Sequence, residues 1–511
     1  MHSGQNLKFY PFNPDLFLNE ERTSTQINYL KRYLKDLGAK SVLEEPNYFD
    51  RDYLAEFANF YGQSVEGYPN VCKRVHIFAD PGISRDLFKR ALSGNARSIS
   101  TIQNRYLGFI VIRPIQTAPL GKTVLSWYPE KTPKNPRVVN PSREYRVDLC
   151  GLELTIKGLA WQQQDRGVSA CATIALWSML QSSALDDYHF IPTTSEITEA
   201  ANKTASLGNR VYPASKGLTL PQICEALKEV GLSPCVVSGD LTNGDVRGFS
   251  RERFASTCSA FIRSGYPVLL GGDLITPGHP PSGHAICAVG FRENPPSAPA
   301  KGEFTLQDGS VHHLYIHDDN IGPSARFGIF SDPESNLAVL KPDRPSSATG
   351  KDPIADYGLF VPKAIIAAIN NELRADPPDE LHILGTQVAS AFSFILGKTP
   401  FPNGLNFSTR FIKKTEYIRA ELSQLLQSRP KVLSKTRLEL VESVRPMSKH
   451  IGLVRIGSGA SPLVDILFDT SDSYLKAFAT VHYVPNFSTL SQIAEAISNV
   501  KLGQYVQATE H

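Results

Sequence analysis

The order of the expected helices and strands between residues 146 and 345 constrains the fold more than any other feature of this chain. Apolar residues with helical spacing come first, and most of the short runs typical of strands follow. Three helices are expected: one begins at Cys171, one is capped by Thr219 with Pro221 in its first turn, and one begins at residue 251. Two strands are expected at 234–237 and 267–270, and two more begin at His284 and His313. Helices followed by a sheet are typical of an α+β domain rather than of alternating strand and helix.

The N-terminal residues 1–145 are expected to form a separate α+β domain with a recognition or structural role. Thr23 or Ser24, and then Asp50, can cap two amphipathic helices, because short polar side chains bond the free N–H groups of a first turn. Strand-like runs follow at 74–79, 106–113 and 123–128, before a proline-rich loop.

Residues 346–511 are expected to form a C-terminal α+β region that packs on the central domain, 146–345, or completes it. The stretch 342–353 has the proline, serine and glycine content of a linker. Helices are expected near 361–373 and 413–428, and the runs 451–456, 463–468 and 477–483 predict an antiparallel meander. A chain of 511 residues has room for three such domains.

Charge and cysteine content limit the partners and the compartment. The net charge is only +3 and no long basic run occurs, so neither nucleic acid nor a membrane is an expected partner. The start of the chain lacks a signal-peptide pattern, and no apolar stretch is long enough to span a bilayer. The seven cysteines are scattered without a CxxC pair, which favours reduced thiols in the cytoplasm. The oligomeric state stays open.

Cys171 stands where a polar loop meets an apolar helix. A helix N-terminus carries positive partial charge, which favours the thiolate form of a cysteine. Most free cysteines are buried and inert. Here the small neighbours Ser169, Ala170 and Ala172 leave the thiol accessible, and a glutamine cluster precedes it. We therefore interpret Cys171 as a candidate nucleophile.

His284 is the candidate general base. A thiol nucleophile needs an imidazole that takes its proton and later returns it to the leaving group. His284 follows Gly283 at the start of an apolar run, where a packed strand would hold it rigidly. His279 is the alternative, although the prolines around it are typical of a loop.

The base also needs an acceptor that holds its second ring nitrogen in one tautomer. Residues 315–317 are expected to form a strand that ends at Asp318. Asp318 is the favoured acceptor, while Asp319 and Asn320 stay open as alternatives, because neighbouring strand residues point to opposite faces.

A glutamine before Cys171 is the candidate oxyanion donor. The tetrahedral intermediate of acyl transfer carries a negative oxygen, which a side-chain amide and the backbone N–H of the nucleophile can stabilise. Gln164 is the favoured residue, with Gln163 and Gln162 as alternatives.

No metal or cofactor is expected. His312, His313 and His317 are close in the sequence, but no cysteine pair or carboxylate spacing completes a zinc site. Neither an HExxH nor a GxSxG pattern occurs.

The middle region resembles the papain-like cysteine peptidases, and most closely the bacterial branch that includes the leader-processing (double-glycine) peptidases of bacteriocin exporters. The matching residues are Gln164, Cys171 with the helix of residues 172–180, Gly283, His284 and Ala285, residues 315–318, and the helix that Thr219 caps. The resemblance implies a papain-like core, made of a helical part and an antiparallel sheet, and a Cys–His–Asp/Asn site that uses no cofactor on a peptide or protein substrate. Ala172 departs from the glycine usual there, and Gln164 lies one residue further from the cysteine.

These observations predict a thiol hydrolase, a cysteine peptidase or isopeptidase, with Cys171 as nucleophile. Two alternatives stay open. The first is acyl transfer to an amine at the same site, as in transglutaminase-like enzymes. The second is a catalytically inactive papain-like scaffold or binding protein, since a fold does not fix a function.

Overall fold

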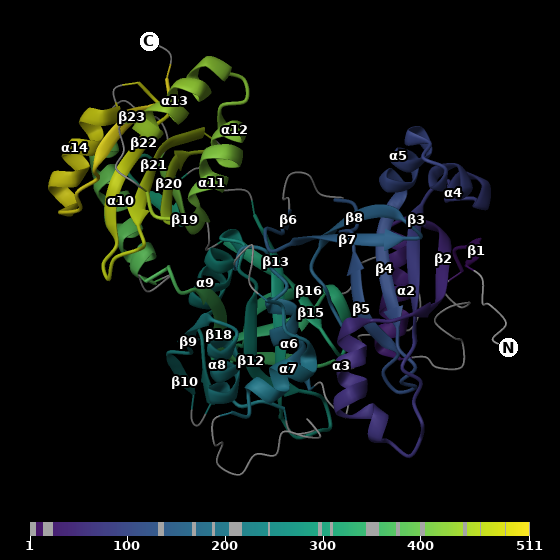
Figure 1. The fold of residues 1–511 in the computed structure, drawn as a ribbon. Helices are drawn as coiled ribbons and strands as arrows, with labels where there is room; N and C mark the ends of the chain where they lie inside the picture. The colour runs from purple at the N-terminus through teal and green to yellow at the C-terminus, as the bar shows by residue number, and fades with distance from the viewer. Residues whose placement is uncertain are drawn as a thin grey trace.

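Figure 1 shows the computed structural model of the chain as three units: an N-terminal sheet unit, a central unit and a C-terminal sheet unit. The structure describes residues 7–13, 24–130, 137–165, 170–185, 190–203, 217–243, 246–294, 299–306, 310–343, 357–374, 379–398, 404–442, 447–459, 461–485 and 487–509. This part mixes helices with largely antiparallel sheets, so the expected α+β class is confirmed. Across these ranges, no helix combines the length and apolar character needed to cross a membrane.

The N-terminal unit is built on an antiparallel sheet in which five described strands pair in sequence order. They are β1 (Lys8–Pro11), β2 (Ala39–Tyr48), β3 (Cys72–Ala79), β4 (Tyr106–Ile112) and β5 (Leu120–Leu125). Its helices are α2 (Thr25–Asp36), α3 (Arg51–Asn59), α4 (Arg85–Leu92) and α5 (Ala96–Arg105). As predicted, Ser24 caps α2 and Asp50 caps α3; their side chains accept from Ile27 N at 3.2 Å and Tyr53 N at 3.0 Å. The hairpin of β7 (Arg143–Leu149) and β8 (Leu152–Gly158) follows.

The central unit is a closed antiparallel barrel. Within the described ranges, six strands pair in the order β12–β13–β15–β16–β17–β18, and β18 pairs back with β12. They are β12 (Val268–Ile275), β13 (Ser282–Glu293), β15 (Val311–Asp318), β16 (Gly322–Ser331), β17 (Ala338–Pro342) and β18 (Leu359–Asn370). Outside the ring, β6 (Arg137–Val138) pairs with β13 and β9 (Leu232–Ser238) with β18, and β10 (Leu241–Asn243) and β11 (Val246–Gly248) form a hairpin. Closure leaves each barrel strand bonded on both sides.

The described helices of the central unit are α6 (Cys171–Met179), α7 (Thr194–Ala200), α8 (Leu220–Glu229) and α9 (Arg251–Arg263). Thr219 precedes α8 as predicted, and its backbone N–H donates to the Gln222 side chain at 2.9 Å. Every residue of α6 after Cys171 is buried, so this apolar helix packs inside the unit, beside β12 and β13. The thiol therefore begins a helix that cannot shift without disturbing the core.

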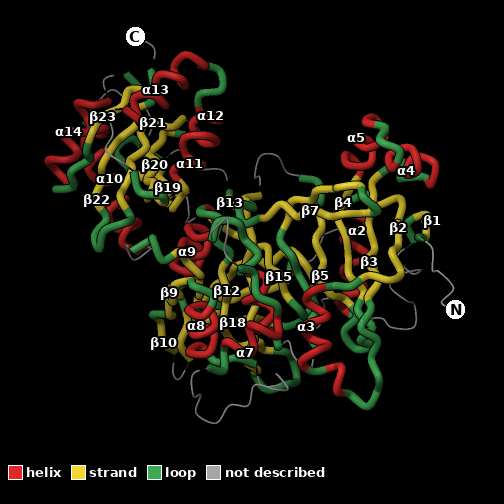
Figure 2. The backbone as a smooth tube through the Cα atoms, in the orientation of Figure 1, coloured by secondary structure: helices red, strands yellow, loops and turns green. Residues whose placement is uncertain are grey.

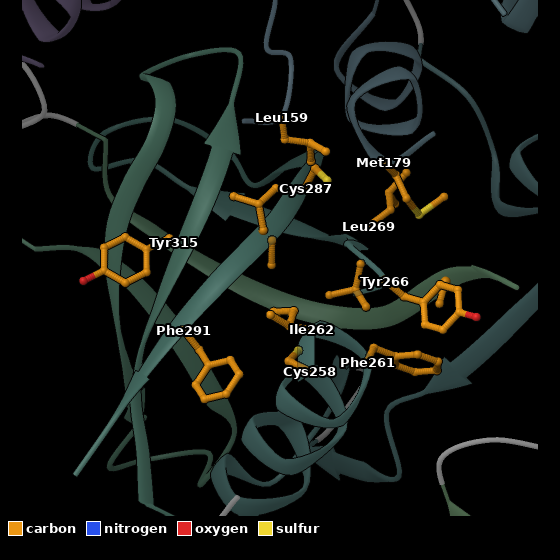
Figure 3. Packing of buried hydrophobic residues seen from close by; sticks show 14 of the residues in the cluster. Leu159, Met179, Cys258, Phe261, Ile262, Tyr266, Leu269, Cys287, Phe291 and Tyr315 are labelled. Carbon is orange, nitrogen blue, oxygen red and sulfur yellow. The ribbon is translucent and has the colours of Figure 1, made fainter. Parts of the chain in front are cut away.

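The core of the central unit lies between α9 and the barrel strands. Figure 3 shows Cys258 and Ile262 of α9 directed toward the strands that carry Leu269 and Phe291. All four side chains are buried. The tube in Figure 2 shows the same helix standing against the strands of the central unit. This packing fixes β12 and β13, the two strands beside α6.

The C-terminal unit is a second sheet, covered by helices (Figure 1). In order its described strands are β14 (Phe304–Leu306), β19 (Leu405–Lys413), β20 (His450–Ser458), β21 (Ser461–Asp469), β22 (Lys476–His482) and β23 (Gln504–Gln507). Its helices are α10 (Asp379–Gly397), α11 (Lys414–Glu416), α12 (Leu422–Leu425), α13 (Pro430–Glu442) and α14 (Phe487–Ser498), with a π turn at Tyr417–Glu421. The predicted antiparallel meander is confirmed as β20–β21–β22.

One expected helix is wrong. The apolar residues of 361–373 predict a helix, but most of the run is strand β18, which lies between β12 and β9 with buried residues on both faces. A short apolar run buried on both faces has no strand-like alternation, so periodicity alone does not separate it from a helix. Because β18 closes the barrel, the central unit takes strands from both sides of the boundary expected at residue 345. The linker expected at 342–353 lies largely outside the described residues.

Candidate active site

Cys171 is the first residue of α6, preceded by Ala170 at the cap position. Its side chain is partly exposed and faces a cavity of about 1060 Å³. The backbone N–H groups of a helix's first turn have no acceptor within the helix, and they concentrate positive partial charge there. The structure thus places the thiol and its own N–H at one wall of an accessible cavity, which is large enough for a peptide segment.

His284 lies at the start of β13 and lines the same cavity. Its side chain is almost completely buried, and its Nε2 atom lies 3.3 Å from Oδ1 of Asp318. Cys171 lines the cavity beside His284 and is close enough to the imidazole to raise its pKa. Because Nε2 faces Asp318, Nδ1 is the ring nitrogen left for the thiol. The alternative histidine, His279, is exposed in a turn and does not line the cavity.

Asp318 is the last residue of β15 and is fully buried. Its Oδ1 atom accepts a hydrogen bond from the backbone N–H of Asn320 at 2.8 Å, in addition to facing His284. Its Oδ2 atom accepts from the Tyr357 hydroxyl. Its backbone carbonyl accepts from the Trp161 indole at 3.0 Å. The carboxylate is therefore held in one orientation by groups from three separate segments.

The two alternatives to Asp318 also lie close to the imidazole. The Asp319 carboxylate is 3.8 Å from Nε2 of His284, and the Asn320 amide nitrogen is 3.4 Å from it. Asp318 makes the shortest contact of the three. The pKa of Asp319 is raised to about 7, chiefly by burial; the charge of His284 opposes the rise and the charge of Asp318 adds to it. A carboxyl with such a pKa is partly protonated at neutral pH.

The charge on Asp318 controls the protonation of His284. Burial lowers the pKa of His284 and is the largest single effect, and the charge and hydrogen bond of Asp318 are the largest effects that oppose it. With smaller contributions from Cys171 and Asp319, the pKa of His284 is raised well above its ordinary value. A protonated imidazole beside a thiol is the environment that favours the thiolate.

The three candidate glutamines have different partners. Gln162 is buried and donates to Glu56 at 2.9 Å, and Gln163 is buried and accepts from Leu120 N at 3.3 Å. Gln164 is partly exposed, and its Nε2 atom donates to the side-chain oxygen of Asn320 at 3.3 Å. The geometry thus brings Gln164, rather than its neighbours, to the group around His284.

The histidine cluster seen in the sequence does not form a common site. His313 pairs with Asp343 at 2.8 Å, while His317 uses one ring nitrogen on a backbone carbonyl at 3.0 Å and the other on a backbone N–H at 3.0 Å. Among described residues, the group close enough to share a metal ion is His284, Asp318 and Asp319, with ligand atoms within 4.8 Å. Both oxygens of Asp318 already accept hydrogen bonds, so the carboxylate is built to hold the imidazole.

Two supporting residues were not found from the sequence. Trp161 stands directly before the glutamines, so its position was visible, but nothing in the pattern indicates a bond to the Asp318 carbonyl. Tyr357 comes 39 residues after Asp318 and reaches it only because β18 closes the barrel next to β12. Neither contact has a local sequence signal.

Comparison of the sequence with models of protein families finds no match, and comparison with curated proteins finds none either. The chemistry open to the site therefore follows from its own residues. Those residues are a thiol at a helix start, an imidazole bonded to a buried carboxylate, and a nearby amide donor.

Proposed function

We propose that this chain is a thiol hydrolase that cleaves a peptide, isopeptide or related amide bond. The observation that carries the proposal is the sequence of contacts from Cys171 to His284 and from His284 to the buried Asp318. A thiol, a base and a group that orients the base are the three parts that nucleophilic catalysis requires.

In the first step the Cys171 sulfur attacks the substrate carbonyl carbon, and the thiol proton is held on His284. The resulting oxyanion accepts hydrogen bonds from the Cys171 backbone N–H and the Gln164 amide. Collapse of the intermediate breaks the C–N bond, and His284 donates its proton to the leaving amine. Water, deprotonated by His284, then hydrolyses the thioester and regenerates the thiol.

The surroundings of the site support a papain-like arrangement of the central unit. Its nucleophile begins a buried helix, and its base and acceptor come from adjacent antiparallel strands, β13 and β15. All seven cysteines are free, as suits a thiol enzyme in a reducing compartment such as the cytoplasm. The cavity of about 1060 Å³ beside the thiol has room for a peptide segment, which is compatible with a peptide or protein substrate.

The decisive measurement is the pH dependence of alkylation by iodoacetamide, followed at each cysteine by mass spectrometry. Cys171 is expected to react rapidly well below pH 8, because a thiolate paired with an imidazolium forms there. In His284→Ala this reaction is expected to slow, while the other six cysteines keep their rates. Cys258 and Cys287 are buried controls that stay slow in both proteins.

Slow alkylation of Cys171 that is indifferent to His284 would contradict the proposal and favour an inactive scaffold. If Cys171 is activated, product analysis with an added primary amine separates the two reactions of the site. Free acid as the only product identifies a hydrolase, whereas an amide formed with the added amine identifies an acyltransferase.

A further inference from the structure

The segment that carries Gln164 is bound to the N-terminal unit rather than to the barrel. Trp161 exchanges two backbone hydrogen bonds with Thr123 of β5, at 2.8 and 3.0 Å. Gln163 N donates to the carbonyl of Leu120 in the same strand at 3.0 Å. Residues 161–163 therefore run along β5, whereas His284 belongs to the barrel and Cys171 begins the helix packed beside it.

Two charged residues of the N-terminal unit complete this attachment. Arg113, just after β4, donates through one NH2 group to the carbonyls of Gln163 and Ala118, both at 2.9 Å. Its other terminal nitrogen, Nη1, donates to Glu56 of α3 at 2.9 Å and lies 3.6 Å from the Asp165 carboxylate. The residues on both sides of Gln164 are thus held by one guanidinium group.

Glu56 extends the same network to the other side of the segment. Its Oε1 atom accepts from Gln162 at 2.9 Å and from Thr194, at the start of α7, at 2.6 Å. Glu56 and Arg113 are buried, at 0% and 3% exposure. The pKa of Glu56 is raised to about 7, chiefly by burial; the charge of Arg113 opposes the rise and that of Asp165 adds to it. Buried charges at such spacing hold their partners in one geometry, because each lost contact leaves an unpaired group.

We propose that Arg113 and Glu56 are positioning residues for Gln164, so that the N-terminal unit is a working part of the active site. The inference rests on the proposed function, because Gln164 matters only if an oxyanion forms beside Cys171. Gln162, Gln163 and Asp165 are all bonded to the N-terminal network, which leaves Gln164 directed toward Asn320 and His284. An oxyanion donor displaced by about 1 Å loses most of its effect.

The test compares two reactions of Cys171 in the full-length chain. Iodoacetamide alkylates a thiolate by displacing iodide and forms no oxyanion. p-Nitrophenyl acetate acetylates it: the S–C bond forms, the bond to p-nitrophenolate breaks, and a tetrahedral oxyanion lies between. Both products are quantified at Cys171 by mass spectrometry, so neither reaction requires the natural substrate.

The variants are Arg113→Lys, Glu56→Gln, Gln164→Ala and the double variant Arg113→Lys/Gln164→Ala. Arg113→Lys keeps the charge and removes the forked set of donors. Glu56→Gln keeps the shape and places an amide against Arg113. Arg455→Lys is the matched control, since Arg455 holds Asp465 by two bonds of 2.7 and 2.8 Å in the C-terminal sheet. Circular dichroism and thermal melting establish that each variant folds; if Arg113→Lys does not, Glu56→Gln and its double variant with Gln164→Ala carry the test.

Gln164→Ala is expected to slow acetylation by about 100-fold, the usual effect of losing one oxyanion donor. Arg113→Lys and Glu56→Gln are expected to slow it by at least about tenfold, and the double variants to be no slower than Gln164→Ala alone. Alkylation by iodoacetamide stays at the wild-type rate in all of them. Arg455→Lys leaves both reactions unchanged.

Two results would overturn the inference while leaving the proposed function in place. One is wild-type acetylation in Arg113→Lys and Glu56→Gln. The other is a double variant in which Arg113→Lys or Glu56→Gln slows acetylation of the Gln164→Ala protein by the same factor as it slows acetylation of the wild type. Arg113 and Glu56 would then act independently of Gln164. If wild-type Cys171 is no faster than the other thiols with either reagent, it is the proposed function that fails.

Discussion

The Tyr357 hydroxyl donates a hydrogen bond to the Asp318 carboxylate, on the oxygen that His284 does not use. Burial and the charge of Asp318 raise the pKa of Tyr357 well above its ordinary value, so the hydroxyl remains a donor at any physiological pH. The carboxylate is thereby fixed between a tyrosine before β18 and a histidine at the start of β13. Closure of the barrel, which pairs both strands with β12, brings these two residues to the same carboxylate.

Tyr357→Phe is expected to lower the free energy of unfolding by about 1–3 kcal/mol, because it leaves a buried charged acceptor without its donor. Urea denaturation followed by fluorescence measures this loss. Tyr474→Phe is the control: Tyr474 is 70% exposed, so the same change there is expected to cost less than about 0.5 kcal/mol. Equal stabilities of the two variants would show that the hydroxyl bond to Asp318 contributes nothing.

Asp318→Asn is expected to lower the pKa of His284, because the largest contribution that opposes burial is removed. With the imidazole neutral near pH 7, alkylation of Cys171 by iodoacetamide slows by about tenfold or more. Titration of the histidine ring by NMR measures the pKa directly. Asp343→Asn removes the carboxylate 2.8 Å from His313 and is the matched control, with Cys171 unaffected. An unchanged His284 titration in Asp318→Asn would exclude Asp318 as the orienting group.

The sequence was sufficient to predict the residues whose signal is local. A cysteine at the start of an apolar helix and an acid at the end of a strand are patterns of a few residues, and the structure brings Cys171, His284 and Asp318 together. The same holds for the caps Ser24 and Asp50, because capping depends on the three residues that follow.

The contacts that depend on chain closure were not predictable. The sequence of β18 lacks the alternation of a strand, because the strand is buried on both faces. That burial follows from its place in a ring of strands and not from its own residue spacing. Among the three glutamines, the partners Glu56 and Leu120 distinguish Gln162 and Gln163 from Gln164, and those partners are 106 and 43 residues away in the sequence. Tertiary partners at such separations leave no trace in local periodicity.

Asp319→Asn is expected to flatten the dependence of stability on pH. The pKa of Asp319 in the folded chain is about 7, above its ordinary 3.8, so its contribution to stability is complete below about pH 4 and is lost as the pH rises through 7. Between pH 5 and pH 8, the free energy of unfolding of the wild type should therefore fall by about 1–3 kcal/mol more than that of the variant. Urea denaturation at both pH values measures this. Asp86 is exposed, so Asp86→Asn is the control and should show the wild-type dependence of stability on pH. The same wild-type dependence in Asp319→Asn would contradict the raised pKa of Asp319.

Gly272→Ala is expected to weaken the barrel at the strand pair that carries His284. Gly272 lies opposite His284 on β12, and a Cβ atom built there would lie 2.1 Å from the carbonyl oxygen of Val361 in β18. The backbone of Val361 cannot move aside as a flexible side chain could, so β12 and β18 must separate, at a cost of about 1–3 kcal/mol. Gly271→Ala is the adjacent control, since a Cβ there meets no atom within 4 Å.

Urea denaturation and Cys171 alkylation are measured on both variants. We expect Gly272→Ala to lose stability and slow alkylation together, because displacement of β12 moves His284 away from the thiol, whereas Gly271→Ala keeps both. Equal stability and equal alkylation rates in the two variants would mean that the close contact at Gly272 neither stabilises the barrel nor holds the base in place.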